Sequence, residues 1–154
     1  MRNRFIPAFT VLELIIVIAV FGLLATLWAI SWNSARAELR DAQRLSDISV
    51  LRSALSQYWL EKATYPVATN LDLGKPGVNA DALTPNGFVS KSDVGTSVYL
   101  SPIPQGPKTG EYYRYHGGAT GYSIRFQTER VTAFGNANVY FAHASGIDTK
   151  DEEK

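Results

Sequence analysis

The fold of this chain is decided by AFTVLELIIVIAVFGLLATLWAISW, residues 8–32. From Leu14 to Trp32 the stretch carries no charged side chain. A helix rises 1.5 Å per residue, so this charge-free part covers about 28 Å, close to the thickness of the hydrocarbon core of a bilayer. The stretch therefore predicts a membrane-spanning helix.

Two other kinds of apolar segment have to be weighed against this interpretation. A secretory signal peptide has a shorter apolar core that ends at a small-residue site such as A-x-A. Residues 25–29, ATLWA, offer only a poor version of that site, and the apolar run continues beyond it. An ordinary single-span anchor remains an alternative on this stretch alone.

Glu13 is a lone carboxylate at the head of the apolar run. An unpaired carboxylate costs roughly 2 to 4 kcal/mol near the bilayer centre and less near its edge. Cleavage before Phe9 would create an α-amino cation at the i, i+4 spacing from Glu13. At about 4 Å and an intermediate effective dielectric, the Coulomb term of that pair is roughly 4 kcal/mol before desolvation. We therefore expect a cut between Ala8 and Phe9, with Glu13 compensated by the new terminus.

These features together resemble the amino-terminal signature of type IV prepilins and of the pseudopilins of type II secretion. The signature is a short basic leader (residues 1–8 here), a small residue, Phe-Thr-x-x-Glu-Leu and a long apolar helix. The residue before the cut is commonly Gly in that family and is Ala8 here. The resemblance implies that a membrane-embedded prepilin peptidase and methyltransferase cleaves the chain there and methylates the amine of Phe9.

The resemblance also implies how the mature chain assembles. Glu13 would pair with the Phe9 amine of a neighbouring copy, and Thr10 and Gly22 belong to the same assembly segment. Many members carry a Gly and a helix-breaking Pro in this segment; Gly22 matches the first, whereas Ile30 stands where the Pro would be. The implied partners are copies of the chain itself, the peptidase, an inner-membrane assembly platform and, before assembly, membrane lipid.

The distribution of basic residues bears on the orientation in the membrane. Arg2 and Arg4 precede the span, whereas several arginines follow it within twenty residues, so a raw positive-inside count favours the opposite topology. Long downstream domains translocate largely regardless of charge. Because the resemblance implies a cytoplasmic leader, we expect a single-pass inner-membrane precursor whose head is exported and becomes extracellular in a pilus.

Residues 33–65 predict an amphipathic continuation of the helix. Apolar residues recur in steps of three and four at Ala35, Leu39, Ala42, Leu45, Ile48, Leu51, Leu55 and Tyr58. The opposite face carries Arg36, Glu38, Arg40, Asp41, Arg44, Asp47 and Arg52, which we expect to be solvated. A rod over residues 9–63 would measure about 82 Å. A coiled-coil dimer is the weaker alternative, because the steps drift from a strict heptad.

Tyr65-Pro66 ends the helix in this interpretation, because the residue before a proline is disfavoured in helical conformation. Residues 66–97 are rich in turn-forming residues and predict a long connection with a short helix near residues 80–83. An antiparallel sheet is predicted over 98–144, followed by a charged tail over 145–154. Strands are expected at 97–100, 111–116, 122–127 and 138–142, with a Gly-rich turn at 117–121. The predicted fold is α+β, a long helix packed on a small antiparallel sheet, as the pilin resemblance implies.

Composition excludes several classes of protein. A chain of 154 residues has room for one compact domain with an appendage, and it contains no cysteine, which excludes disulfides and thiolate metal clusters. The formal charge is +1. Without Arg2 and Arg4 there are thirteen basic side chains against fourteen acidic ones, so the chain lacks the basic excess of a dedicated nucleic-acid binder.

No pattern in the chain predicts catalysis, and we expect no metal or cofactor. His116 and His143 are the only histidines, and neither has a carboxylate or second histidine at ligand spacing. The Asp-Pro-Trp turn and acidic calcium loop of many major pseudopilins are missing from the head. A set of aromatic and basic residues could stack on single-stranded DNA, although packing in the sheet is favoured: Tyr112, Tyr113, Tyr115, Tyr122, Tyr140, Lys108, Arg114 and Arg125.

The function predicted from the sequence is that of a structural subunit that polymerises into a type IV pilus-like filament. Within the same machinery, a pseudopilin of a type II secretion system is the first alternative. A monomeric binding domain on a permanent membrane anchor is the second. An exported enzyme is the third, and no catalytic constellation supports it.

Overall fold

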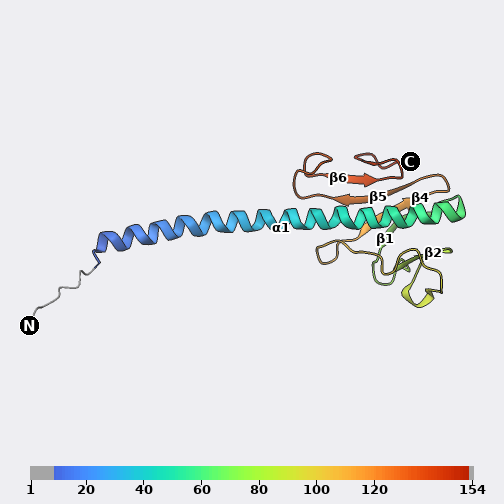
Figure 1. The fold of residues 1–154 in the computed structure, drawn as a ribbon, viewed down its shortest axis with the longest axis horizontal. Helices are drawn as coiled ribbons and strands as arrows, with labels where there is room; N and C mark the ends of the chain where they lie inside the picture. Colours follow the sequence, from blue (N-terminus) through green and yellow to red (C-terminus); the bar gives the residue numbers. More distant parts are fainter. Residues whose placement is uncertain (1–8, 153–154) are drawn as a thin grey trace, which may run out of the picture. The chain divides into compact units, whose positions relative to one another are not determined.

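The computed structural model describes residues 9–152, and the fold is α+β as predicted (Figure 1). It has one long helix, α1 (Val11–Lys62), and a short 3-10 helix, η1 (Lys91–Asp93). The strands are β1 (Ala68–Leu73), β2 (Ala82–Thr84), β3 (Gly87–Val89), β4 (Tyr113–Gly117), β5 (Tyr122–Gln127), β6 (Val139–Ala142) and β7 (Ile147–Asp148). The chain divides into two compact units, Met1–Arg36 and Ala37–Lys154, and we call the second the head.

The head is built on a five-stranded sheet of order β1-β4-β5-β6-β7 in which every neighbouring pair is antiparallel. The predicted glycine turn between β4 and β5 is confirmed, since the Gly118 N–H donates to the carbonyl of Gly121 at 3.0 Å. Strands β2 and β3 form a separate hairpin. From β4 to β7 neighbouring strands follow one another along the chain, whereas β1 pairs with β4 across the segment that contains the β2–β3 hairpin.

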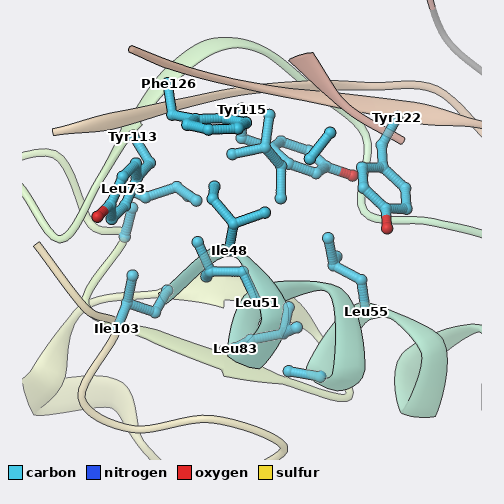
Figure 2. Close-up of a cluster of buried hydrophobic side chains, with 14 of the residues drawn as sticks. Ile48, Leu51, Leu55, Leu73, Leu83, Ile103, Tyr113, Tyr115, Tyr122 and Phe126 are labelled. Carbon is cyan, nitrogen blue, oxygen red and sulfur yellow. The ribbon is translucent and has the colours of Figure 1, made fainter. Parts of the chain in front are cut away.

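The core lies between α1 and the sheet. Figure 2 shows Ile48, Leu51 and Leu55 projecting from the helix toward aromatic rings of β4 and β5. All three aliphatic side chains are at most 2% exposed. On β5, Tyr122, Ile124 and Phe126 face this core while Arg125 and Gln127 are exposed, as the alternation predicted. Burial of these side chains holds the head together without a disulfide.

The apolar stripe of the helix is only partly covered by the head. From Ile48 onward its members are buried, whereas Ala35 and Ala42 are exposed and Leu39 is 70% exposed. The head therefore packs on the second half of the stripe. Within the head, Leu39 and Ala42 are exposed and Leu45 is only partly buried against the core.

The predicted connection over 66–97 is wrong, because the segment contains β1, β2 and β3. The short helix expected near residues 80–83 is a strand instead. Thr84 closes a tight hairpin, with its hydroxyl accepting the Asn86 N–H at 3.2 Å and donating to the Gly87 carbonyl at 3.2 Å. The turn residues that predict a loop here join short strands instead.

The strand expected at 97–100 is wrong as well, and the helix end is shifted. Of residues 97–100, only Leu100 forms a β-bridge, to Leu83. The helix ends at Lys62, before the expected 63–65, because Ala63 adopts a left-handed φ of 53° while its N–H still bonds the Trp59 carbonyl at 2.8 Å. A residue in this left-handed conformation ends a helix, and here it does so three residues before Pro66.

Candidate functional site

The apolar part of α1 is the first functional feature. By length and composition α1 is the one helix of the described residues that could cross a membrane, and none of its most apolar window is buried within the chain. Its large apolar side chains are between 40% and 77% exposed from Phe9 to Trp28. Such a surface requires lipid or other protein around it. The feature fits a membrane-anchored subunit.

Thr10 and Glu13 are brought together at the start of this helix. The hydroxyl of Thr10 accepts the backbone N–H of Glu13 at 3.2 Å, and the Thr10 carbonyl accepts the N–H of Leu14 at 3.2 Å. Thr10 is therefore the N-cap, and its spacing to Glu13 is that of a capping box. The carboxylate also lies in the first helical turn, where the helix dipole favours a negative charge. The T-x-x-E spacing of residues 10–13 is the signal in the sequence that indicates this cap, which is absent from the sequence-based predictions.

The other predicted assembly residues are placed only in part. Ala8 lies outside the described residues, and Phe9 is 77% exposed ahead of the helix. A Cβ added at Gly22 would meet no atom within 4 Å, so nothing inside the chain demands a glycine there. The roles of these residues in cleavage, methylation and assembly stay predictions.

A buried ion cluster joins the helix to the head. Arg44 is fully buried, and its guanidinium donates to both carboxylate oxygens of Glu111, at 2.6 and 2.8 Å. It also donates to Asp41 at 2.7 Å and is paired with Glu129 at 2.8 Å. Asp41 in turn accepts the backbone N–H groups of Glu129 and Arg130, at distances between 2.8 and 3.0 Å.

Two further cations complete this cluster around Glu129. Arg40 donates to both of its carboxylate oxygens, at 2.9 and 2.6 Å, and Lys108 approaches it at 3.0 Å. The cluster is thus Arg40, Asp41, Arg44, Lys108, Glu111 and Glu129, with three charges of each sign. Burial opposes the charge on Arg44, but its hydrogen bonds to the three acids outweigh burial and raise its pKa. The hydrogen bond from Arg40 holds the pKa of Glu129 well below its ordinary value.

The prediction of a solvated charged face is therefore wrong for Arg40, Asp41 and Arg44. Apart from the Arg44–Asp41 pair within the helix, their partners lie more than sixty residues along the chain, and no local pattern reveals such pairings. Asp47 also has a partner that is distant in the sequence, since the Tyr113 hydroxyl donates to it at 2.7 Å. Burial, opposed by this hydrogen bond, raises the pKa of Asp47.

The tyrosines of the head are structural. Tyr113, Tyr115, Tyr122 and Tyr140 are at most 3% exposed, and the hydroxyl of Tyr115 donates to the Pro66 carbonyl at 2.7 Å. Packing in the sheet is confirmed for these four. Their faces are covered, so they offer no surface on which nucleic-acid bases could stack.

The carboxyl-terminal segment is partly docked, so the prediction of a solvated tail is wrong for Asp148, which lies half-buried in β7, whereas Asp151 is exposed. The buried His143 ring contacts the Tyr122 carbonyl at 3.1 Å and, through its other nitrogen, Asp148 at 3.2 Å and the Lys150 carbonyl at 3.1 Å. Ser123 donates to Asp151 at 2.6 Å. His143 is a satisfied structural histidine, as interpreted from the sequence. Within residues 9–152 no three His, Asp or Glu side chains are arranged to hold a metal ion.

Comparison with curated proteins supports the resemblance to the type IV pilin and pseudopilin family. The chain is 29% identical over 112 residues to the type II secretion system core protein G of Klebsiella michiganensis, which covers 73% of this chain and 75% of that protein. It is 27% identical over 107 residues to the protein of the same name from Aeromonas hydrophila, covering 70% and 71%. No protein-family model and no solved structure matches the chain. The resemblance predicted from the amino-terminal signature is confirmed by these two relatives.

The ion cluster yields a stability prediction. Arg44→Ala leaves the buried Asp41 and the partly buried Glu111 without their cation, so we expect a loss of about 3 kcal/mol in the free energy of unfolding. The free energy of unfolding is measured by urea unfolding of the full chain in detergent. The near-ultraviolet signal of the buried tyrosines reports the transition. The control is Arg125→Ala on the exposed face of β5, expected to change it by less than about 0.5 kcal/mol. Equal losses in both variants would contradict a stabilising cluster.

Glu129 yields a pH prediction. Its pKa is depressed in the folded state, so its contribution to stability is complete above its ordinary value of 4.5 and is lost as the pH falls from there toward the folded value. We expect unfolding at pH 6 and pH 3 to show a smaller difference in stability for Glu129→Gln than for the unmodified chain. Asp47, with its raised pKa, acts in the opposite direction and is common to both proteins. If the loss of stability between pH 6 and pH 3 is the same for Glu129→Gln as for the unmodified chain, Glu129 is excluded as an acid-sensitive group.

Proposed function

We propose that this chain is a membrane-anchored, non-enzymatic subunit that polymerises with copies of itself into a pilin-like filament. The observation that carries the proposal is the apolar helix segment from Leu14 to Trp28, exposed along its length and without cover from the chain's own head. A permanent anchor would need the same segment, but it would not need the combination of Phe9, Thr10 and Glu13 ahead of it. The similarity to secretion-system core proteins also supports a filament subunit.

Assembly would begin with removal of residues 1–8 by a prepilin peptidase, followed by methylation of the Phe9 amine. Thr10 then holds the first helical turn, and the Glu13 carboxylate stands one turn from the new cation. In lipid the apolar segment is solvated by acyl chains. Once an inner-membrane assembly platform extracts the subunit, the Phe9 amine of one copy and Glu13 of the next would pair while the apolar helices pack together.

The second candidate is a pseudopilin that forms a short periplasmic filament for protein secretion. Both relatives carry the name of a type II secretion system core protein, which favours this function specifically. Deletion of the chain from its native cell distinguishes the two functions. Loss of exported proteins from the medium with no change in sheared surface fibres indicates a pseudopilin. Loss of surface fibres with normal secretion indicates a pilus subunit.

The role of Glu13 gives the test of the filament mechanism. We expect Glu13→Gln to be cleaved normally, so that mass spectrometry finds an N-methylated Phe9 terminus in both proteins, but to give at least about tenfold less filament. The reason is that the amide keeps the size of the side chain and removes the charge that pairs with the amine. Filament yield is measured by sedimentation and electron microscopy.

The matched control for this variant is Glu61→Gln, which neutralises an exposed carboxylate in the last turn of the same helix. It should assemble like the unmodified chain. Normal assembly of Glu13→Gln would remove the carboxylate from the mechanism. A native chain that begins at Met1 and stays monomeric would instead leave only a tethered binding domain.

A further inference from the structure

Two tryptophans and an arginine lie on one side of α1 where the apolar run ends. Trp28, Trp32 and Arg36 follow one another at intervals of four residues, a spacing that places side chains on the same side of a helix. The two indole rings stack with their centroids 5.4 Å apart, and the Arg36 guanidinium lies 4.9 Å from the centroid of the Trp32 ring. We call these three side chains the tryptophan–arginine ladder. All three belong to the first compact unit, so the ladder is complete within that unit.

The side chain of Arg36 points back along the helix toward the apolar run. Side chains of a helix tilt toward its amino terminus, and the contact with Trp32 shows this direction for Arg36. The guanidinium therefore lies beside the last residue of the apolar run and points away from the charged residues that follow in the sequence. A permanent cation thus stands at the boundary between apolar and polar helix surface.

The charge of Arg36 is not neutralised within the part of the chain that the structure describes. No carboxylate of residues 9–152 is paired with Arg36, and its side chain is exposed. None of the helix neighbours three and four residues away is acidic: Trp32, Asn33, Leu39 and Arg40. The fork of N–H donors of the guanidinium is therefore available to a ligand that carries oxyanions.

The spacing of charges along α1 gives the depth of Arg36 in a bilayer. Arg36 is the first charged residue after Glu13, and the twenty-two residues between them are uncharged. Along a helix their Cα atoms are about 35 Å apart. The hydrocarbon core is about 30 Å thick, and the headgroup layers extend the bilayer to about 40 to 45 Å. With Glu13 at one edge of the hydrocarbon, Arg36 lies in the opposite headgroup layer, where tryptophan side chains are also enriched.

We propose that the tryptophan–arginine ladder binds the phosphate of an anionic phospholipid headgroup. The Arg36 guanidinium can donate two parallel hydrogen bonds to phosphate oxygens, while the indole rings present apolar surface to the glycerol and the upper acyl chains. A headgroup with its own cation competes for the phosphate, so phosphatidylglycerol binds more tightly than phosphatidylcholine. The inference goes beyond the filament function and rests only on the membrane-anchored form of the subunit.

Lipid titration of the full chain in neutral detergent micelles tests the proposal. Phosphatidylglycerol with short acyl chains is added to the micelles, and native mass spectrometry measures the fraction of chains that hold the lipid. We expect Arg36→Gln to weaken binding by about fivefold, the contribution of one arginine at a membrane surface. The matched control is Arg125→Gln, which removes the same charge from the exposed face of β5 and should change binding by less than about twofold. Equal affinity of the unmodified chain and Arg36→Gln would overturn the proposal.

Two further measurements identify the ligand and the role of the rings. Trp32→Leu keeps an apolar side chain but removes the ring under the guanidinium, so we expect binding to weaken by about two- to fivefold. Inorganic phosphate, added without lipid, should not be retained by the unmodified chain. If it binds as tightly as phosphatidylglycerol, the ladder is a site for free anions and the lipid assignment is wrong. Both substitutions lie outside the head, so both variants should keep its thermal unfolding midpoint.

The binding measurement uses the unpolymerised chain, so its outcome is separate from that of the filament experiments. If the unmodified chain polymerises in its native cell but Arg36→Gln binds phosphatidylglycerol equally well, the ladder is excluded and the filament function stands. If the unmodified chain binds the lipid through Arg36 but forms no filament, the ladder stands and the filament function fails. A chain that does not enter micelles at all would contradict both.

Discussion

The architecture of the head depends on the need to neutralise Arg44, which is wholly buried in the face of α1. Its three acids come from three places: Asp41 on the same helix, Glu111 ahead of β4 and Glu129 after β5. A buried guanidinium with an unsatisfied partner is costly, so all three segments must close on the helix together. The same closure anchors the β5–β6 loop, because Asp41 binds the backbone N–H groups at its start. The ion cluster thereby fixes the start of this loop against α1.

Local patterns in the sequence predicted the parts of the fold that local physics controls. A charge-free run of nineteen residues requires a helix in lipid, and the alternation over 122–127 requires a half-buried strand; both were correct. The strands within 66–97 could not be predicted in the same way. They are short and bounded by turn residues, and residues such as Leu83 are buried only because Ile103 and the helix cover them. The pairing of Arg44 was equally out of reach, since its partner Glu111 lies sixty-seven residues away.

Two influences act on Glu13, and their magnitudes differ. Capping by Thr10 and the helix dipole favour a carboxylate in the first turn, but a dipole contributes only about 0.3 to 1 kcal/mol. The cost of an unpaired carboxylate in apolar surroundings is roughly 2 to 4 kcal/mol near the bilayer centre. At the membrane edge, where that cost is smaller, the cap can suffice for the precursor. Deeper among apolar helices it does not, so the proposed filament would require a cation that pairs with Glu13.

The two units of the chain differ in what they require from their surroundings. The head has a buried aromatic core and an ion cluster with equal numbers of positive and negative charges. The segment before Arg36 buries almost nothing within the chain. Its apolar surface therefore requires lipid or other protein around it. Lipid meets this requirement for a membrane-anchored subunit, and neighbouring copies would meet it in the proposed filament.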